Sequence, residues 1–249
     1  MAPFGWAPLS SQFILSELSM FKKVFCLLYF ATLFSSLEAY AALKILPLGD
    51  SITHGYTSRG GYRYPLEKLM KARGVSIDFV GSEKSKKDSF FDATDVDHEG
   101  HLGWRIDQIS AKVPEWIRNH NPDIVLLLIG TNDVYQKFDV TGAPQRLRNL
   151  VRQILTIDPQ VRVIVGSLFP AKHSMIQDPN VNRQIEQDLD YFNREIKSQF
   201  TEISPRFRLV DLNDRMNAMT MTVDGVHPTK SAYEEIARRW FSALIRLLD

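Results

Sequence analysis

Two short segments near opposite ends of the chain supply a hydroxyl, an imidazole and a carboxylate. Ser51 follows Gly49 and Asp50, and His227 follows Asp224 by three residues. A serine hydroxyl is a weak nucleophile at neutral pH, so it needs a base to take its proton and a partner that orients the base. Because Asp-x-x-His can bring carboxylate and imidazole together within one turn, the pattern predicts nucleophilic catalysis by Ser51. His227 is the expected base and Asp224 its partner.

A third segment ends in an amide side chain that could meet a charged oxygen. The apolar run 122–129 has the composition of a buried strand, and Asn132 follows it closely. An asparagine at the carboxyl end of a parallel strand can direct its amide into the crevice where ligands bind. We therefore expect Asn132 to be one donor of an oxyanion hole.

A fourth segment, His-Glu-Gly-His-Leu-Gly-Trp at 98–104, places two glycines before an expected helix. The first N–H groups of a helix have no partner within the helix and can bind anions. The Gly103 N–H, together with the Ser51 N–H, is therefore a candidate oxyanion donor. Gly100 competes for this role, and we favour Gly103 because it directly precedes Trp104, where the helix is expected to begin.

The four segments occur in the order found in the SGNH (GDSL-type) hydrolases, which are named for a Ser, a Gly, an Asn and a His in separate blocks. The chain resembles that superfamily over almost all of residues 42–249, with one departure, Ile52 in place of Leu. The matching residues are Ser51, Gly103, Asn132 and His227, with Asp224 completing the triad. Segments 98–104 and 77–82 are also similar to carbohydrate esterase family three, which is linked to removal of acetyl groups from xylan.

The resemblance implies a serine esterase that hydrolyses acetyl esters on a plant polysaccharide, with xylan as the leading substrate, through an acyl-enzyme. It implies neither a cofactor nor a metal. Two alternatives stay open: a lipase, arylesterase or thioesterase of the same superfamily, and a non-catalytic carbohydrate-binding protein. The second is disfavoured because every catalytic position holds a competent residue.

Apolar runs alternate with helical patterns along the chain, which predicts a parallel sheet with helices on both faces. Strands are expected at 43–48, 76–81, 123–129, 161–168 and 207–211, and helices at 62–73, 104–119, 144–157, 182–200 and 229–248. The resemblance implies a three-layer α/β/α fold with a flavodoxin-like, five-stranded parallel sheet in the order 2-1-3-4-5. Ser51 would then lie at the carboxyl end of the central strand.

The N-terminal segment has the pattern of a targeting signal. Lys22 and Lys23 precede the apolar run 24–34, and Ala-Tyr-Ala ends at Ala41. This pattern predicts a signal peptide that starts at Met20 and is cleaved after Ala41, and the run is shorter than the roughly 20 residues of a membrane span. Residues 1–41 are then an upstream extension and signal, residues 42–249 a single SGNH domain, and the protein secreted or periplasmic, without membrane attachment after cleavage.

The overall charge of the chain bears on its partners. The formal net charge is +1, which argues against a nucleic-acid partner because such proteins usually carry a basic surface. An acetylated oligo- or polysaccharide is the expected partner. A metal is not expected, since His98 and His101 do not have the His-Glu-x-x-His spacing of zinc hydrolases.

Several side chains near the four segments are candidate substrate contacts. Aromatic rings there can stack on sugars or can belong to the core, and Asp50 can alternatively order its own turn through backbone N–H groups. The candidates are Asp50, Tyr56, His98, Trp104 and Tyr135.

Overall fold

The computed structural model describes residues 41–249 except 59, 86–96, 171–177, 201–202 and 249. Residues 42–249 make up one compact unit. The predicted signal peptide lies outside the described residues apart from Ala41, and its cleavage stays a prediction. None of the helices in the described part of the chain is long and apolar enough to cross a membrane.

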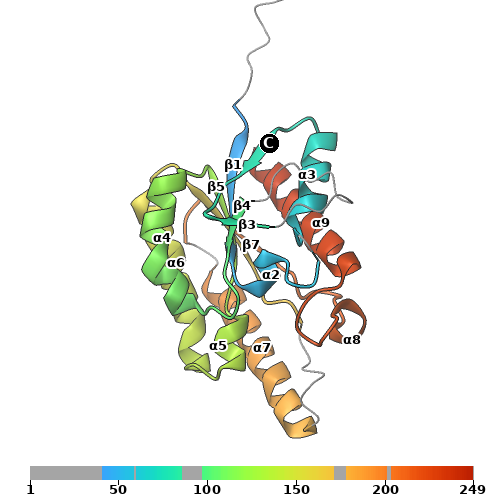
Figure 1. Ribbon diagram of the computed structural model, residues 1–249. Helices are drawn as coiled ribbons and strands as arrows, with labels where there is room; N and C mark the ends of the chain where they lie inside the picture. Colours follow the sequence, from blue (N-terminus) through green and yellow to red (C-terminus); the bar gives the residue numbers. More distant parts are fainter. Residues whose placement is uncertain (1–40, 59, 86–96, 171–177, 201–202, 249) are drawn as a thin grey trace, which may run out of the picture. The chain divides into compact units, whose positions relative to one another are not determined.

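A central parallel sheet organises this unit (Figure 1). Its five main strands pair in the order β2-β1-β5-β6-β7, and every one of these pairs is parallel. The strands are β1 (Leu43–Gly49), β2 (Ile77–Phe79), β5 (Ile124–Leu128), β6 (Arg162–Gly166) and β7 (Phe207–Val210). The predicted order 2-1-3-4-5 is therefore confirmed for these strands, with β1 in the interior of the sheet between β2 and β5.

Two further strands were not predicted. β4 (Asp97–Gly100) pairs in parallel with the end of β1, beyond the part of β1 that pairs with β2, and β3 (Glu83–Lys84) runs antiparallel to β4. The expectation of a wholly parallel, five-stranded sheet is wrong in this respect, because β3 and β4 are too short and polar to show an apolar strand pattern. β4 places Gly100 beside Gly49, so the chain that follows β4 begins next to Ser51.

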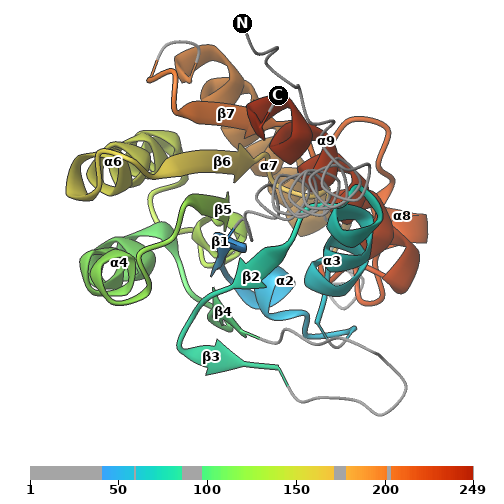
Figure 2. The ribbon, with the colours of Figure 1, turned by 90° about the horizontal axis from the view of Figure 1, so that it is seen from above.

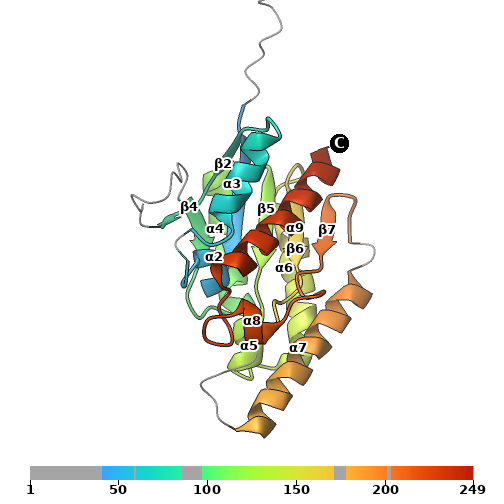
Figure 3. The same ribbon diagram turned by 90° about the vertical axis from the view of Figure 1, so that its right-hand side faces the viewer.

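Helices cover both faces of the sheet, as predicted (Figures 2 and 3). One face packs against α4 (Ile106–His120), α6 (Ala143–Ile157) and α7 (Pro179–Gln199), and the other against α3 (Arg63–Ala72) and α9 (Lys230–Leu248). Shorter elements follow the strand ends: α2 (Ser51–His54), α5 (Thr131–Tyr135), the 3-10 helix η1 (Val140–Gly142) and α8 (Ala218–Met221).

The burial of β5 explains why its apolar run is continuous rather than alternating. On β5, Val125 and Leu127 pack into the cluster under α4, α6 and α7, whereas Leu126 and its alternate neighbours pack into the cluster under α3 and α9. All five side chains of β5 are fully buried. A strand covered on both faces buries every side chain, and this burial supplies the main driving force for the fold.

Candidate functional site

Ser51 lies at a sharp turn between β1 and α2. A Cβ on Gly49 would lie 2.1 Å from the carbonyl oxygen of Leu128 on the neighbouring strand, so only glycine fits there. The Asp50 carboxylate accepts a hydrogen bond of 2.9 Å from the Ile52 N–H and caps α2. Ser51 is the first residue of α2, and the turn presents it at the carboxyl end of the central strand.

Ser51, His227 and Asp224 form a continuous hydrogen-bonded chain, although 176 residues separate Ser51 from His227. Nε2 of His227 lies 2.9 Å from Oγ of Ser51, and Nδ1 lies 2.6 Å from Oδ2 of Asp224. The two imidazole nitrogens thus face a hydroxyl and a carboxylate. With Nδ1 donating to Asp224, Nε2 is free to accept the serine proton.

The segment that carries His227 is closed on itself. The Val223 N–H donates to the His227 carbonyl at 2.9 Å, and Thr222 and Pro228 form an isolated antiparallel bridge. The Thr57 hydroxyl donates to the Pro228 carbonyl at 2.7 Å and ties this segment to the chain that follows α2. These contacts hold the imidazole beside Ser51.

Asp224 is arranged to stay ionised. Burial alone would raise the pKa of Asp224, but hydrogen bonds from the backbone and ring of His227 and from the Val226 N–H outweigh it and hold the pKa below its usual range. A negative Asp224 orients the imidazole and stabilises it when it becomes protonated.

Asn132 lies near the start of α5, directly after β5. Its Nδ2 donates one hydrogen bond of 2.9 Å to the Trp104 carbonyl, which leaves the second amide hydrogen for another acceptor. Asp133 is fully buried and accepts a hydrogen bond from the Ile106 N–H, the first residue of α4. α5 therefore fixes both the start of α4 and the loop before it, residues 101–105.

The structure distinguishes the two candidate glycines. The Gly100 N–H donates to Nδ1 of His98 at 3.0 Å, and a Cβ on Gly100 would lie 2.4 Å from the His54 nitrogen. Gly103 has φ +75°, open space around its Cβ position, and no acceptor for its N–H among the residues that the structure describes. The helix after it begins at Ile106, two residues later than expected, since Arg105 and not Gly103 is the N-cap.

The two glycines predict opposite outcomes on substitution. Gly100→Ala is expected to lower the free energy of unfolding by about 3 kcal/mol or more, because the new methyl meets backbone atoms that cannot move aside. Gly103→Ala adds only the cost of a left-handed backbone, about 1–2 kcal/mol. Because Gly103 is a candidate oxyanion donor, this substitution should lower activity more than stability. Urea titration and esterase assays on both variants would check this. A stable, active Gly100→Ala protein would contradict it.

Asp50 and His98 are not substrate contacts in this structure, which corrects the expectation from the sequence. Both side chains are fully buried. Burial raises the pKa of Asp50 to about 7 and lowers the pKa of His98 to about 2. Asp50 instead caps α2 and His98 accepts from Gly100, so these polar residues support the turn and β4 from inside.

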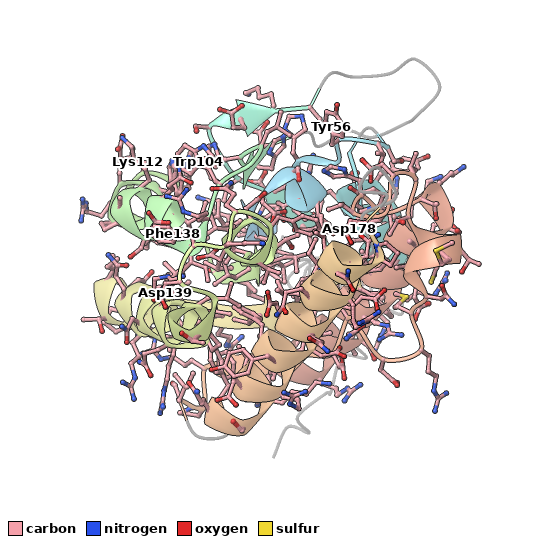
Figure 4. All side chains as sticks on the ribbon, turned by 90° about the horizontal axis from the view of Figure 1, so that it is seen from below. Tyr56, Trp104, Lys112, Phe138, Asp139 and Asp178 are labelled. Carbon is pink, nitrogen blue, oxygen red and sulfur yellow. The ribbon has the colours of Figure 1, made fainter. Side chains whose placement is uncertain are left out.

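The three aromatic candidates lie in different environments. Tyr56 is 62% exposed, and its ring centroid lies 4.9 Å from that of His227. Trp104 is half-buried, and its ring stacks on that of His101 with a centroid distance of 4.2 Å. Figure 4 shows Tyr56 and Trp104 from the end of the unit where the chain leaves β1 and β5. Tyr135 is half-buried like Trp104, and both pack against the core cluster under α4, α6 and α7. Tyr56 is thus the best placed to touch a ligand at Ser51.

Within the described residues, no group of three or more His, Cys, Asp or Glu side chains is arranged to hold a metal ion.

One contributor to the site was missed from the sequence. Gln136 donates to the Gly103 carbonyl at 2.8 Å and accepts from Arg105 at 2.7 Å, so it anchors the 101–105 loop. Its position four residues after Asn132, on the same helical face, was a usable signal.

A comparison with protein families identifies the chain. Residues 48–235 match the model of the GDSL-like lipase/acylhydrolase family, a stretch that contains Ser51, Asn132 and His227. The chain belongs to this family. The superfamily predicted from the four segments is therefore confirmed.

Relatives within the GDSL-like family include carbohydrate esterases. The solved structure of a Clostridium thermocellum family 3 carbohydrate esterase has 32% sequence identity and a TM-score of 0.66, covering 84% of this chain and 99% of that one. An acetyl esterase mutant, solved with an acetate ion, has 27% identity and a TM-score of 0.65, covering 82% of this chain and 97% of that one.

A curated relative is much longer than this chain. A multidomain esterase of Ruminococcus flavefaciens is 28% identical in an alignment 227 residues long, which covers 83% of this chain and 29% of that protein. The chain thus spans less than a third of that relative's length.

Proposed function

We propose that this member of the GDSL-like family is a carboxylic ester hydrolase that removes acetyl groups from a carbohydrate polymer, with acetylated xylan as the leading substrate. The observation that carries the proposal is the line of contacts Ser51–His227–Asp224 in a chain 32% identical to a family 3 carbohydrate esterase. The exposed ring of Tyr56 beside His227 supports it, because an accessible aromatic face next to the reacting centre suits stacking on a sugar ring.

In this mechanism Ser51 is the nucleophile. His227 Nε2 takes the Ser51 proton as Oγ bonds to the acyl carbon, and Asp224 stabilises the resulting imidazolium. The same Nε2–H then protonates the departing sugar oxygen as its bond to the acyl carbon breaks. Water next gives a proton to His227, attacks the acyl-enzyme and releases acetate, and the proton returns to Ser51. The complete cycle leaves the triad as it began.

Negative charge on the acyl oxygen is met by N–H donors in this proposal. The donors are the backbone N–H groups of Ser51 and Gly103 and the second hydrogen of the Asn132 amide. Two observations support Gly103 over Gly100. The Gly100 N–H donates to His98, whereas the Gly103 N–H has no acceptor in the part of the chain that the structure describes. Trp104 belongs to the 101–105 loop that carries Gly103, and we propose it, with Tyr56, as a contact for the sugar.

Acyl length gives the decisive test of the substrate. Activity on 4-nitrophenyl esters is expected to peak at acetate and to fall about 10–100-fold by butyrate, because a pocket closed behind the acetyl methyl has no room for added methylenes. Acetate should also be released from acetylated xylan, measured enzymatically, and not from deacetylated xylan treated in the same way.

The rival function is a lipase-like or arylester hydrolase of the same family. Exposed Leu102 and Val223, adjacent in sequence to Gly103 and Asp224, are the observation that favours it, since they offer apolar surface near the acyl site. Activity that rises from acetate to octanoate, without acetate release from xylan, would support this rival and contradict the proposal.

A further inference from the structure

A buried carboxylate with two histidine partners adjoins the 101–105 loop. Glu99, on β4, is fully buried, and its Oε2 lies 2.9 Å from Nε2 of His101. Its Oε1 accepts a hydrogen bond of 2.5 Å from the Ser82 N–H and lies 3.3 Å from Nε2 of His120, at the end of α4. A buried charge is costly unless it is paired and hydrogen-bonded, so these donors explain how Glu99 is tolerated.

These contacts fix the charge state of Glu99. Burial alone would raise the pKa of Glu99, but the hydrogen bonds from His101 and Ser82 outweigh it and hold the pKa below its usual range. An ionised carboxylate only accepts hydrogen bonds, so Nε2 of His101 must carry a proton and donate it. The His101–Glu99 contact is therefore a charge-assisted hydrogen bond, which is stronger and more directional than a neutral one.

The His101 ring is also held by two indoles. It stacks on Trp104 at a centroid distance of 4.2 Å and on Trp116 at 4.9 Å, with interplanar angles of 21° and 11°. Trp116 belongs to α4 and is almost fully buried, whereas Trp104 belongs to the loop itself. Through Trp116 and Glu99, His101 connects the loop to two elements of the rigid framework, α4 and β4.

The other contacts of the loop leave the Leu102 and Gly103 N–H groups without an acceptor among the described residues. The His101 N–H donates to the Gly49 carbonyl at 2.9 Å, and the carbonyls of Gly103 and Trp104 accept from Gln136 and Asn132. The backbone of the loop is thus tied at both ends, while the Gly103 N–H between them has no acceptor among the described residues.

We infer that His101, bonded to Glu99, is a positioning residue that fixes the Gly103 N–H in the oxyanion hole. The inference rests on the role given to Gly103 in the proposed function. β4 ends at Gly100, so loss of the His101 side chain removes the link from the loop to Glu99 and the ring that stacks on both Trp104 and Trp116. The loop then keeps its backbone bond to Gly49, the contacts from α5 and the packing of Trp104 on the core cluster. An oxyanion donor acts through preorganisation, and a displacement of about 1 Å can cost about 10²-fold in rate.

His120 supplies a matched control. It contacts the same carboxylate but touches no residue of 101–105 in the described contacts. His101→Phe and His120→Phe each remove one imidazole from Glu99 and keep an aromatic ring. A purely structural role of the Glu99 cluster predicts similar effects from both variants, whereas positioning of Gly103 predicts an effect on catalysis from His101 alone.

The test measures 4-nitrophenyl acetate hydrolysis and the inhibition constant of methylboronic acid, whose tetrahedral adduct on serine mimics the charged intermediate. His101→Phe should lower kcat by about 10–100-fold with KM within about twofold, and should weaken boronate inhibition in parallel. His120→Phe should keep both constants within about threefold of wild type. His101→Gln keeps an N–H donor for Glu99, so its kcat should lie between those of His101→Phe and the wild-type protein. If His101→Phe does not fold, the kcat of His101→Gln is compared with that of the wild-type protein instead.

Specific results would overturn the inference. Unchanged kcat in His101→Phe, unchanged boronate inhibition despite lower kcat, or equal losses in both Phe variants would each do so. The Ser51→Ala protein separates this failure from failure of the proposed function. If Ser51→Ala keeps wild-type activity, the assigned site itself is wrong. If Ser51→Ala is inactive and His101→Phe is fully active, the positioning role alone is contradicted.

Discussion

The Ser51→Ala protein is expected to hydrolyse 4-nitrophenyl acetate with a kcat about 10⁴–10⁶-fold below that of the wild-type protein. The physical reason is that alanine removes the hydroxyl held 2.9 Å from the His227 base, so no acyl-enzyme can form. His227→Ala should lose about as much, because the hydroxyl then has no proton acceptor. Steady-state kinetics on purified proteins, with thermal unfolding to show that each variant folds, would measure this.

The double variant gives the sharper result. Since Ser51 and His227 act as one unit, the double alanine variant should be scarcely slower than either single variant. Asp224→Asn tests the third member separately: it keeps the side-chain size but loses the charge that holds Nδ1–H toward Oδ2, and it should also lower kcat strongly. Additive losses in the double variant, or a His227→Ala protein with near-normal turnover, would show that the triad is assigned wrongly.

The sequence could predict the parts of the fold that depend on long apolar runs. Segment 122–129 reads as a strand buried on both faces, and β5 is that strand, with its alternate side chains in two different clusters. It could not predict β3 and β4, because their pairing depends on Gly100 lying beside Gly49 and not on any apolar pattern within 97–100. Short polar strands are specified by tertiary context, which one sequence does not display.

The site shows the same division. Ser51, Asp224, His227 and Asn132 follow turns whose spacing can be interpreted locally, and the structure brings them to one edge of the sheet. Burial was harder to predict: Asp50 and His98 look like polar residues near a site, yet both are enclosed by the framework that holds it. The contact of Glu99 with His120 joins residues from β4 and the end of α4, and nothing in the local sequence indicates it.

Asn132→Ala is expected to lower kcat by about 10²–10³ with KM changed by less than about threefold. The amide already donates one hydrogen to the Trp104 carbonyl, which fixes its orientation, and its second hydrogen is the proposed oxyanion donor. A donor aimed at charge that develops only in the transition state stabilises that state more than bound substrate, so the loss appears in kcat. Full kinetic curves on 4-nitrophenyl acetate would separate the two constants.

Asn132→Asp is the matched variant for this prediction. It keeps the shape of the side chain but has no N–H, and its charge opposes the oxyanion, so it should be at least as slow as Asn132→Ala. A rise in KM with unchanged kcat in either variant would mean that Asn132 binds the substrate ground state instead. Because Asn132 also holds the Trp104 carbonyl of the loop that carries Gly103, its effect should be coupled to that of His101. In the double variant His101→Phe/Asn132→Ala the combined loss should therefore fall short of the product of the two single losses.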